Sequence, residues 1–191
     1  RDSPPFGDIE ESQSRIYFGE QSTNFAIVGR LEGQSPIELD TPGGAEGGGE
    51  QYNEYDGTGG VPMGDLWGRL LFSTRFADLN ILLSDRVNAE SKVLYDRTPK
   101  QRVEKVAPWL TVDQNLYPAV VDGRLVWIVD AYTTSNTYPN SQRVQLSQAT
   151  SDTQSSALGG QADQPINYIR NSVKAVVDAY DGSVKLYAWD E

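Results

Sequence analysis

Apolar and polar residues alternate most regularly near the carboxyl end of the chain, on both sides of two Asp-Gly pairs. An Asp-Gly pair between apolar runs is a strong sign of a β-hairpin, because both turn residues need a positive φ. We therefore predict two hairpins, and we expect the fold to be organised around them. Each consists of an apolar run, a turn and a second apolar run: 117–121, Asp122-Gly123 and 124–132, then 173–180, Asp181-Gly182 and 183–189.

The second hairpin can be given a register if its Asp-Gly pair is a two-residue loop. Side chains then alternate between the two faces of the ribbon. The predicted cross-strand pairs are Val177–Leu186, an Asp178–Lys185 ion pair and a Lys174–Trp189 cation–π contact. The predicted core face carries Val173, Ala175, Val177, Ala179, Val184, Leu186 and Ala188.

The first hairpin contains the most apolar strand of the chain. Residues 124–132 are apolar on both faces, which predicts a central strand covered on both sides. Its partner contains Pro118, which has no N–H to donate, so we expect an edge strand or a break there.

The amino-terminal third is less regular. Residues 1–14 form an acidic lead-in, and 15–19 and 24–29 are predicted as short strands. The span 32–60 is rich in glycine and typical of a mobile loop. It lacks the Gly-Lys-Ser/Thr ending of a phosphate cradle, and a weaker alternative places an anion on the Gly59-Gly60 amides at the start of the next helix.

Helical spacing predicts one long helix over Met63–Leu83, with Phe72, Phe76, Leu79 and Leu83 on one stripe and Leu66 and Leu70 beside it. Four charged residues interrupt it (Asp65, Arg69, Arg75 and Asp78), so we expect a helix buried under the sheet rather than a membrane span.

A second, shorter helix is predicted over Pro99–Val106. Thr98 is a capping residue, Pro99 suits the first helical position and Gln101 completes a capping box. Val103, Val106 and Ala107 should form its buried stripe, and Pro108 should end it.

The segment between the hairpins, 133–164, is polar and contains Gly159-Gly160. It is either a flexible crossover or an ordered loop that carries binding residues. The tetrapeptide Val-Asp-Ala-Tyr occurs at 129–132 and again at 177–180, through coincidence of two strand ends or through duplication of a hairpin.

Together these patterns predict an α+β fold, with an antiparallel sheet built on the two Asp-Gly hairpins and packed against one long and one short helix. We expect a single domain over 1–191, with strands and the glycine-rich loop in 1–62 and the helices and sheet in 63–191. Because the chain starts with Arg and ends with Glu, we expect it to be a piece of a longer protein.

Composition narrows the function. The net charge is −11, which makes nucleic acid and anionic lipid improbable partners and suits cations or a cationic polymer. The chain has neither Cys nor His, which excludes Ser-His-Asp and Cys-His catalysis, zinc sites built on those residues, and disulfides. We expect no cofactor.

Carboxylates and aromatic rings are the remaining candidates for a site. Asp130 and Asp178 could act together in glycoside hydrolysis if their strands are neighbours, although strand-end polar residues explain them more simply. Asp122 and Asp181 are best explained as turn formers, because no calcium-loop pattern surrounds them, and a Ser172–Lys174 dyad lacks a pocket. The candidate ligand-binding residues are Asp130, Asp178, Tyr132 and Tyr180. Stacking on sugars or on a partner is an alternative to core packing for Tyr132, Tyr138, Tyr180, Tyr187 and Trp189.

Several long motifs resemble one family: Arg-Ile-Tyr-Phe-Gly-Glu at 15–20, Gly-Gly-Val-Pro-Met-Gly at 59–64, Leu-Leu-Ser-Asp at 82–85, and the stretches 102–110, 117–134 and 167–182. It is an uncharacterised family of large bacterial, mainly actinobacterial, multi-pass membrane proteins, and the resemblance covers about 15–191. The segments 34–53 and 142–164 look variable.

In that family a bundle of membrane helices precedes a large extracytoplasmic region. The resemblance implies that this chain is part of that region, and it carries over no activity, cofactor or catalytic residue. The implied partners are the membrane-embedded part of the same polypeptide and an envelope protein or glycan.

We therefore expect a non-enzymatic binding module on the extracytoplasmic side of the cell membrane. Two alternatives remain open. One is a carboxylate hydrolase of envelope glycan. The other is a module that restrains a peptidase, because 176–184 is similar to the hairpin of small PepSY-type secreted domains.

Overall fold

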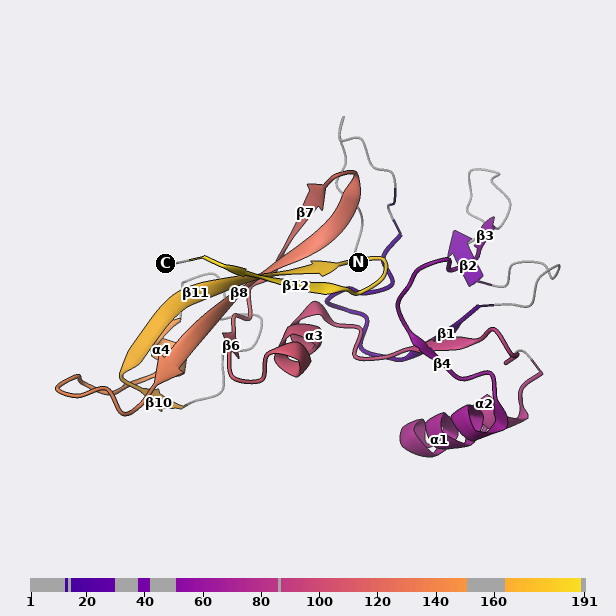
Figure 1. Ribbon diagram of the computed structural model, residues 1–191, viewed down its shortest axis with the longest axis horizontal. Helices are drawn as coiled ribbons and strands as arrows, with labels where there is room; N and C mark the ends of the chain where they lie inside the picture. Colours follow the sequence, from indigo (N-terminus) through magenta and orange to yellow (C-terminus); the bar gives the residue numbers. More distant parts are fainter. Residues whose placement is uncertain are drawn as a thin grey trace. The chain divides into compact units, whose positions relative to one another are not determined.

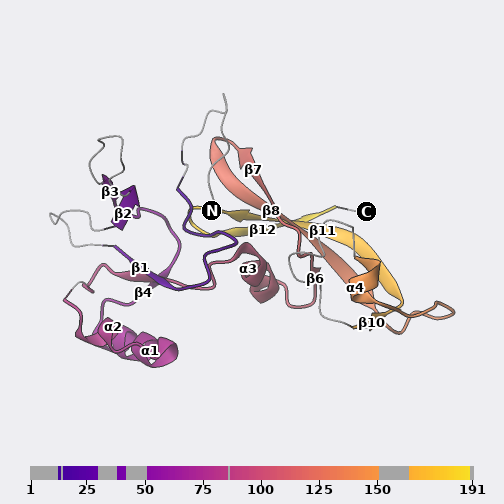
Figure 2. The same cartoon turned by 180° about the vertical axis from the view of Figure 1, so that it is seen from behind.

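The computed structural model describes residues 13, 15–29, 38–41, 51–85, 87–150 and 164–189. In this part of the chain helices and antiparallel sheets occur together, so the predicted α+β class is confirmed. The chain divides into two compact units, which we name the sheet unit (Arg1–Thr23 and Asp96–Glu191) and the helix unit (Asn24–Tyr95). Figure 1 and Figure 2 show their elements from opposite sides. The boundaries differ from the expected division after residue 62, and a single domain stays a prediction.

Within the described residues, five antiparallel strands form the main sheet, in the order β12-β11-β8-β6 with β7 also paired to β8. The central position predicted for 124–132 is confirmed. Among the described residues β7 pairs with β8 and with no other strand, which is the edge position that Pro118 predicted. The strands are β6 (Thr111–Val112), β7 (Tyr117–Val121), β8 (Arg124–Ser135), β11 (Tyr168–Asp178) and β12 (Val184–Ala188).

The first hairpin has the predicted two-residue loop. Val121 pairs with Arg124, and both loop residues have a positive φ, 51° for Asp122 and 75° for Gly123. These angles are those of the turn that matches the twist of the two strands.

The second hairpin has a different register from the one predicted. Val177 pairs with Val184 rather than with Leu186, so the loop is longer than two residues. The cause is local: the Oδ1 atom of Asp178 accepts the backbone N–H groups of Tyr180 and Asp181 at 2.8 and 3.0 Å, which folds the chain before the Asp-Gly pair. Because the shift is two residues, every side chain keeps its face.

The new register changes the cross-strand contacts. Lys185 lies opposite Val176, so the predicted Asp178–Lys185 pair is wrong, and Asp178 pairs with Arg124 instead. The cation–π contact is confirmed, with the Lys174 ammonium 5.0 Å from the centre of a Trp189 ring. The core face is confirmed for Ala175, Val177 and Ala179, whereas Leu186 is 39% exposed and Ala188 is exposed.

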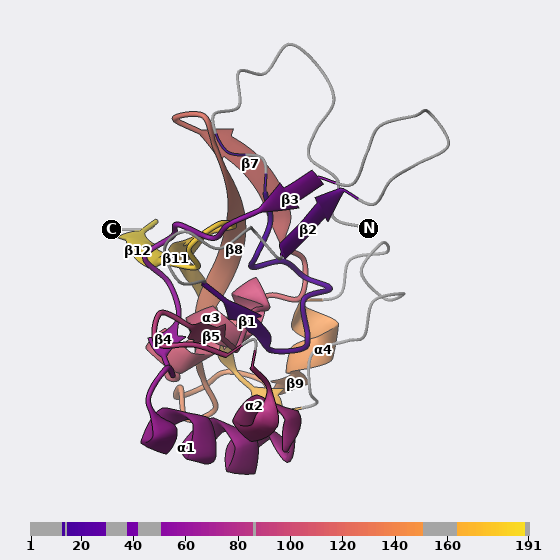
Figure 3. The ribbon, with the colours of Figure 1, turned by 90° about the vertical axis from the view of Figure 1, so that its right-hand side faces the viewer.

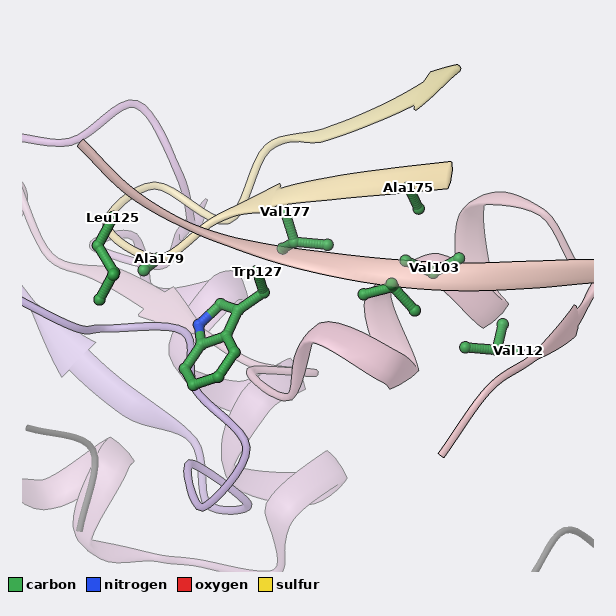
Figure 4. Close-up of a cluster of buried hydrophobic side chains, with 8 residues drawn as sticks. Val103, Val112, Leu125, Trp127, Ala175, Val177 and Ala179 are labelled. Carbon is green, nitrogen blue, oxygen red and sulfur yellow. The ribbon is translucent and has the colours of Figure 1, made fainter. Parts of the chain in front are cut away.

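The short helix α3 (Pro99–Val106) is the one that the sequence predicted. The Thr98 side chain accepts the N–H of Gln101, and Pro99 opens the helix. Val103 is fully buried beneath the sheet, whereas Val106 is half exposed and does not belong to the buried stripe. Figure 4 shows Val103 directed at the face of the sheet that carries Trp127, Ala175 and Val177.

Residues 15–19 are not the strand that the sequence predicted. They cross the end of the sheet, where the N–H groups of Tyr17 and Phe18 both donate to the Ala179 carbonyl. Phe18 is fully buried, and its own carbonyl accepts the indole N–H of Trp127 at 2.9 Å. Arg102 covers the Phe18 ring at 4.6 Å. This segment closes the core of the sheet unit.

The segment between the hairpins is ordered over 133–150. The segment begins inside β8. The ring of Tyr138 stacks on that of Tyr168, with 5.2 Å between the ring centres. Residues 151–163 lie outside the described residues, as do residues 1–12 and 14 of the predicted lead-in and much of the variable segments. The elements here are β9 (Val144–Gln145), α4 (Leu146–Ala149) and β10 (Pro165–Ile166).

In its described residues the helix unit contains a small three-stranded sheet in the order β1-β5-β4 and a separate β2-β3 pair. The strand predicted at 24–29 is confirmed as β1. The glycine-rich span contains β2 and β3, while 42–50, the glycine run, lies outside the described residues. The strands are β1 (Ala26–Val28), β2 (Glu38–Thr41), β3 (Gln51–Asn53), β4 (Val61–Pro62) and β5 (Lys92–Leu94).

The long helix predicted over 63–83 is wrong, because the structure has two helices there, α1 (Leu66–Phe76) and α2 (Asn80–Leu83). Ala77 between them has a φ of 52°, and its N–H bonds back to the last turn of α1. Phe72 packs with Met63, Ile81 and neighbouring residues of the helix unit. Figure 3 shows α1 and α2 side by side. In the described residues no helix combines the length and the apolar character needed to cross a membrane.

Candidate functional site

Asp130 lies on β8 among polar side chains of β11. It forms an ion pair with Lys174, the residue directly opposite it on β11. Its Oδ1 also accepts a hydrogen bond from the side-chain amide of Asn171 at 3.2 Å. Both charged side chains are more than four-fifths buried. The carboxylate of Asp130 is therefore engaged by a cation and by an amide donor, both from the neighbouring strand.

Tyr132 lies two residues further along the same strand, and therefore on the same face as Asp130. Its hydroxyl donates to the carboxylate of Asp113, while the N–H of Asp113 donates to the Asp130 carbonyl. The structure thus brings two of the four predicted ligand-binding residues, Asp130 and Tyr132, into one polar network on the sheet.

Asp178 belongs to a different cluster, at the second hairpin turn. The guanidinium of Arg124 bridges Asp178 at 3.0 Å and Asp181 at 3.2 Å. Burial lowers the pKa of Arg124, but the two carboxylates outweigh it and raise that pKa above its ordinary value. Burial raises the pKa of Asp181, yet hydrogen bonds from Ser183 and the charge of Arg124 hold it below its ordinary value. The cluster fixes the turn.

Tyr180, the fourth predicted residue, is 6% exposed. Its ring meets that of Tyr17 edge-on, with 5.3 Å between ring centres. It packs the end of the sheet beneath the 15–19 segment, so its ring offers no face to a ligand.

The geometry does not favour hydrolysis by Asp130 and Asp178. Asp178 lies four residues along β11 from Lys174, the partner of Asp130, so the backbone positions of Asp130 and Asp178 are about 13 Å apart along the strands. Glycosidases need their carboxylates within roughly 5–9.5 Å of each other. In the part of the chain that the structure describes, no group of three carboxylates could hold a metal ion.

The alternative that placed an anion on the Gly59-Gly60 amides lacks the helix start that it required. These residues precede β4 and not a helix, and the N–H of Gly59 already donates to the Tyr55 hydroxyl at 3.0 Å. The next helix begins at Leu66, where the carboxylate of Asp65 accepts the N–H of Gly68 and caps it.

The sequence prediction missed an exposed apolar surface on the helix unit, which we name the α1–α2 apolar face. Its side chains are 42–75% exposed. Neighbouring residues in a helix point in different directions. The adjacent apolar pairs 66–67 and 70–71 therefore indicate that α1 is apolar on its inner and its outer side. A helix of this kind is normally buried. The face consists of Leu66, Trp67, Leu70 and Leu71 on α1 with Leu79 and Leu83 at α2.

Comparison with known proteins identifies relatives along the whole chain. The model of an uncharacterised protein family (UPF0182) matches residues 1–191. A UPF0182 protein of Kineococcus radiotolerans is 53% identical over 98% of this chain, one of Arthrobacter sp. is 56% identical over 97%, and one of Bifidobacterium longum is 51% identical over 98%. The chain covers 18, 19 and 18% of these relatives, so it spans about a fifth of their length. No solved structure matches it.

Proposed function

This chain belongs to the uncharacterised protein family UPF0182, and from that premise we propose that it is a non-enzymatic interaction module of a larger membrane protein. The module lies on the extracytoplasmic side, and through the α1–α2 apolar face it holds another part of the same polypeptide. The membrane setting is supported by the resemblance of its motifs to large multi-pass proteins.

The α1–α2 apolar face is the observation that carries the proposal. Trp67 is 75% exposed, and Leu66, Leu71 and Leu83 are 64–75% exposed. Single exposed apolar residues are common on proteins, but the four large ones within two turns of α1 are typical of an interaction surface. Tryptophan is also a residue type that contributes strongly to interfaces.

The occupant that fits best is protein from the same polypeptide. The relatives are about five times as long as this chain, so most of the polypeptide lies beyond these residues. A segment linked covalently to the module is present at high effective concentration, and apolar contacts of modest area are then sufficient to hold it.

Lipid fits the same face less well. Helices that lie on a membrane carry many Lys and Arg residues on their polar side. In α1 the cations are Arg69, which donates to the Val87 carbonyl, and Arg75, which lies over the rings of Phe76 and Tyr95. The net charge of −11 would also be repelled by anionic lipid.

The non-enzymatic character rests on the chemistry available. The chain has no His and no Cys, and the carboxylates predicted as candidates are engaged in ion pairs. Restraint of a peptidase stays an alternative, because 176–184 is similar to the hairpin of PepSY-type domains and α3 packs against the sheet that contains this hairpin.

A photo-crosslinking experiment in the full-length protein tests the proposal. Trp67 is replaced by p-benzoylphenylalanine, the cells are irradiated, and the crosslinked peptides are identified by mass spectrometry. Trp109 provides the matched control, because it is 71% exposed and belongs to the sheet unit. We expect crosslinks from position 67 to segments of the same polypeptide beyond these 191 residues, and few from position 109.

Other crosslinks would contradict the proposal in distinguishable ways. Adducts with lipid from position 67 would assign the face to the membrane. Adducts with a separate envelope protein or a second copy would assign it to another chain, and the absence of any adduct would remove its role in interaction.

A further inference from the structure

The strand β12 forms one edge of the main sheet. Among the described residues it pairs with β11 alone, in a register without a bulge. An edge strand presents N–H and C=O groups to which a further strand can bind, and proteins protect such edges with proline, bulges or charges. The other edge contains β7 with its Pro118. In β12 there is no proline, and Lys185 is the one charged residue.

The hydrogen bonds at the two ends of β12 show which of its backbone groups point outward. The N–H of Trp189 donates to the Ser172 carbonyl, and the N–H of Asp178 donates to the Ser183 carbonyl. Hydrogen-bonded pairs alternate with non-hydrogen-bonded pairs along an antiparallel ladder, so the intervening pairs follow from the register. The residues whose N–H and C=O groups point away from β11 are Val184, Leu186 and Ala188.

The side chains along this edge are exposed and largely apolar. Leu186 lies opposite Ala175, on the face of the sheet that α3 covers, and is 39% exposed. Tyr187 and Lys185 lie on the other face, where Tyr187 is 51% exposed and Lys185 is exposed. A strand added to this edge would therefore cover apolar surface on both faces while its backbone bonds to the three outward residues.

A second copy of β12 fits this edge. In an antiparallel pair related by a two-fold axis, Leu186 can lie opposite Leu186 of the second copy. Val184 then lies opposite Ala188, and Lys185 lies opposite Tyr187. All the outward residues of both strands are paired in this register, which gives about six hydrogen bonds, two for each pair.

Charge favours this register over its neighbours. It places each Lys185 ammonium beside the ring of Tyr187 in the other copy, where a cation–π contact can form. A shift of two residues in either direction leaves one outward residue of each β12 without a partner in the other strand. In one direction it also sets Lys185 against Lys185, and like charges directly opposite each other destabilise a sheet.

We propose that two copies of the protein associate through β12, which pairs antiparallel with β12 of the second copy about a two-fold axis at Leu186. The main sheets of the two copies then form one continuous sheet. The contact is isologous, as two-fold interfaces are, and it closes, so it does not lead to a filament. The net charge of −11 repels a second copy, but salt screens this repulsion beyond about 8 Å at physiological ionic strength.

Disulfide trapping in the full-length protein tests the register. Two forms with different tags are co-expressed, the cells are oxidised with copper phenanthroline, and mixed dimers are detected by non-reducing electrophoresis. Leu186→Cys in both forms should give a mixed disulfide, because the two Cα atoms are about 5.5 Å apart. Lys185→Cys in one form should also react with Tyr187→Cys in the other. Tyr187→Cys in both forms is the matched control and should give none, because those Cα atoms are about 8 Å apart.

A charge exchange at the axis tests the association without a crosslink. Leu186→Lys in both forms, or Leu186→Glu in both, sets like charges against each other and should reduce co-capture of the two tagged forms about tenfold or more. Co-expression of the Lys form with the Glu form should restore co-capture to about the native level. Because Leu186 is exposed at the edge, neither substitution buries a charge within one copy.

The proposal would be overturned by the absence of a mixed disulfide at position 186, or by one that forms at position 187 in both copies. Native co-capture of the forms that both carry Leu186→Lys would also overturn it, as would failure of the Lys and Glu forms to associate. These readouts do not involve Trp67, so this test and the crosslinking test can fail separately.

Discussion

Trp127 of the sheet unit and Trp67 of the helix unit differ strongly in exposure. In the sheet unit Trp127 is 5% exposed and its indole N–H donates to the Phe18 carbonyl, whereas in the helix unit Trp67 is 75% exposed. The sheet unit covers its main apolar face with α3 and the 15–19 segment. The helix unit buries one side of α1 and leaves the other apolar side uncovered.

The two units therefore differ in how much of their apolar surface is covered within the same unit. A sheet with one helix on its inner face can bury its apolar side chains within the same unit. The helix unit is short, and a small unit buries a smaller fraction of its surface. The apolar face that the helix unit leaves uncovered is the feature on which the proposed interaction rests.

The largest expected effect separates the two tryptophans. Trp127→Ala removes a buried ring and leaves the Phe18 carbonyl without its donor, so it should lower the free energy of unfolding by about 3–5 kcal/mol. Trp67→Ala should change it by less than about 0.5 kcal/mol, since that ring is exposed. Chemical denaturation of both variants measures the difference. Equal losses would mean that Trp67 is part of a core and not of an interaction surface.

A smaller effect is expected at the helix caps. Thr98→Ala and Asp65→Ala each remove a side-chain acceptor at a helix start and should each cost about 1 kcal/mol. Hydrogen exchange should show faster exchange in α3 for the first variant and in α1 for the second. Thr98→Ser and Asp65→Asn, which keep an acceptor, are the controls. Unchanged exchange in α1 after Asp65→Ala would show that its contacts, and not its cap, hold that helix.

The smallest effect concerns the acid stability of the second hairpin. The folded-state pKa of Asp181 lies below its ordinary value of 3.8, so its contribution is present above pH 3.8 and is lost as the pH falls through the folded value. Asp181→Asn should therefore flatten the dependence of stability on pH below about 4. Asp122→Asn in the other hairpin turn, where the side chain is exposed, is the control. A curve as steep as that of the native chain would refute the assignment.

Local patterns predicted the elements whose determinants are close in sequence. The hairpin at Asp122-Gly123 and the helix opened by Thr98 and Pro99 depend on residues within a few positions of each other. For the second hairpin the sequence predicted the strands correctly but not their register. The Asp178 side chain accepts hydrogen bonds from backbone N–H groups of its own turn, and this changes the turn. Asx-type capping by Asp178 could be seen in the sequence only as one option among several.

The candidate site was less predictable than the fold. Asp130 and Tyr132 share a face of β8, but their contacts with Lys174 and Asp113 come from other segments of the chain. The distance between Asp130 and Asp178 likewise follows from the pairing of β8 with β11. The split of α1 from α2 at Ala77 carries no glycine or proline signal, so periodicity alone joined them.

The sequence by itself determined the strands of the two hairpins, the turn at Asp122-Gly123, the capped helix and the absence of His- and Cys-based chemistry, because each depends on residue types and short spacing. The tertiary structure alone decided that residues 15–19 close the sheet unit, that the carboxylates are paired, that one side of α1 is uncovered and that β12 lies at an edge of the main sheet. These features arise when segments distant in the chain meet, and the free energy of those contacts depends on burial, which no local pattern encodes.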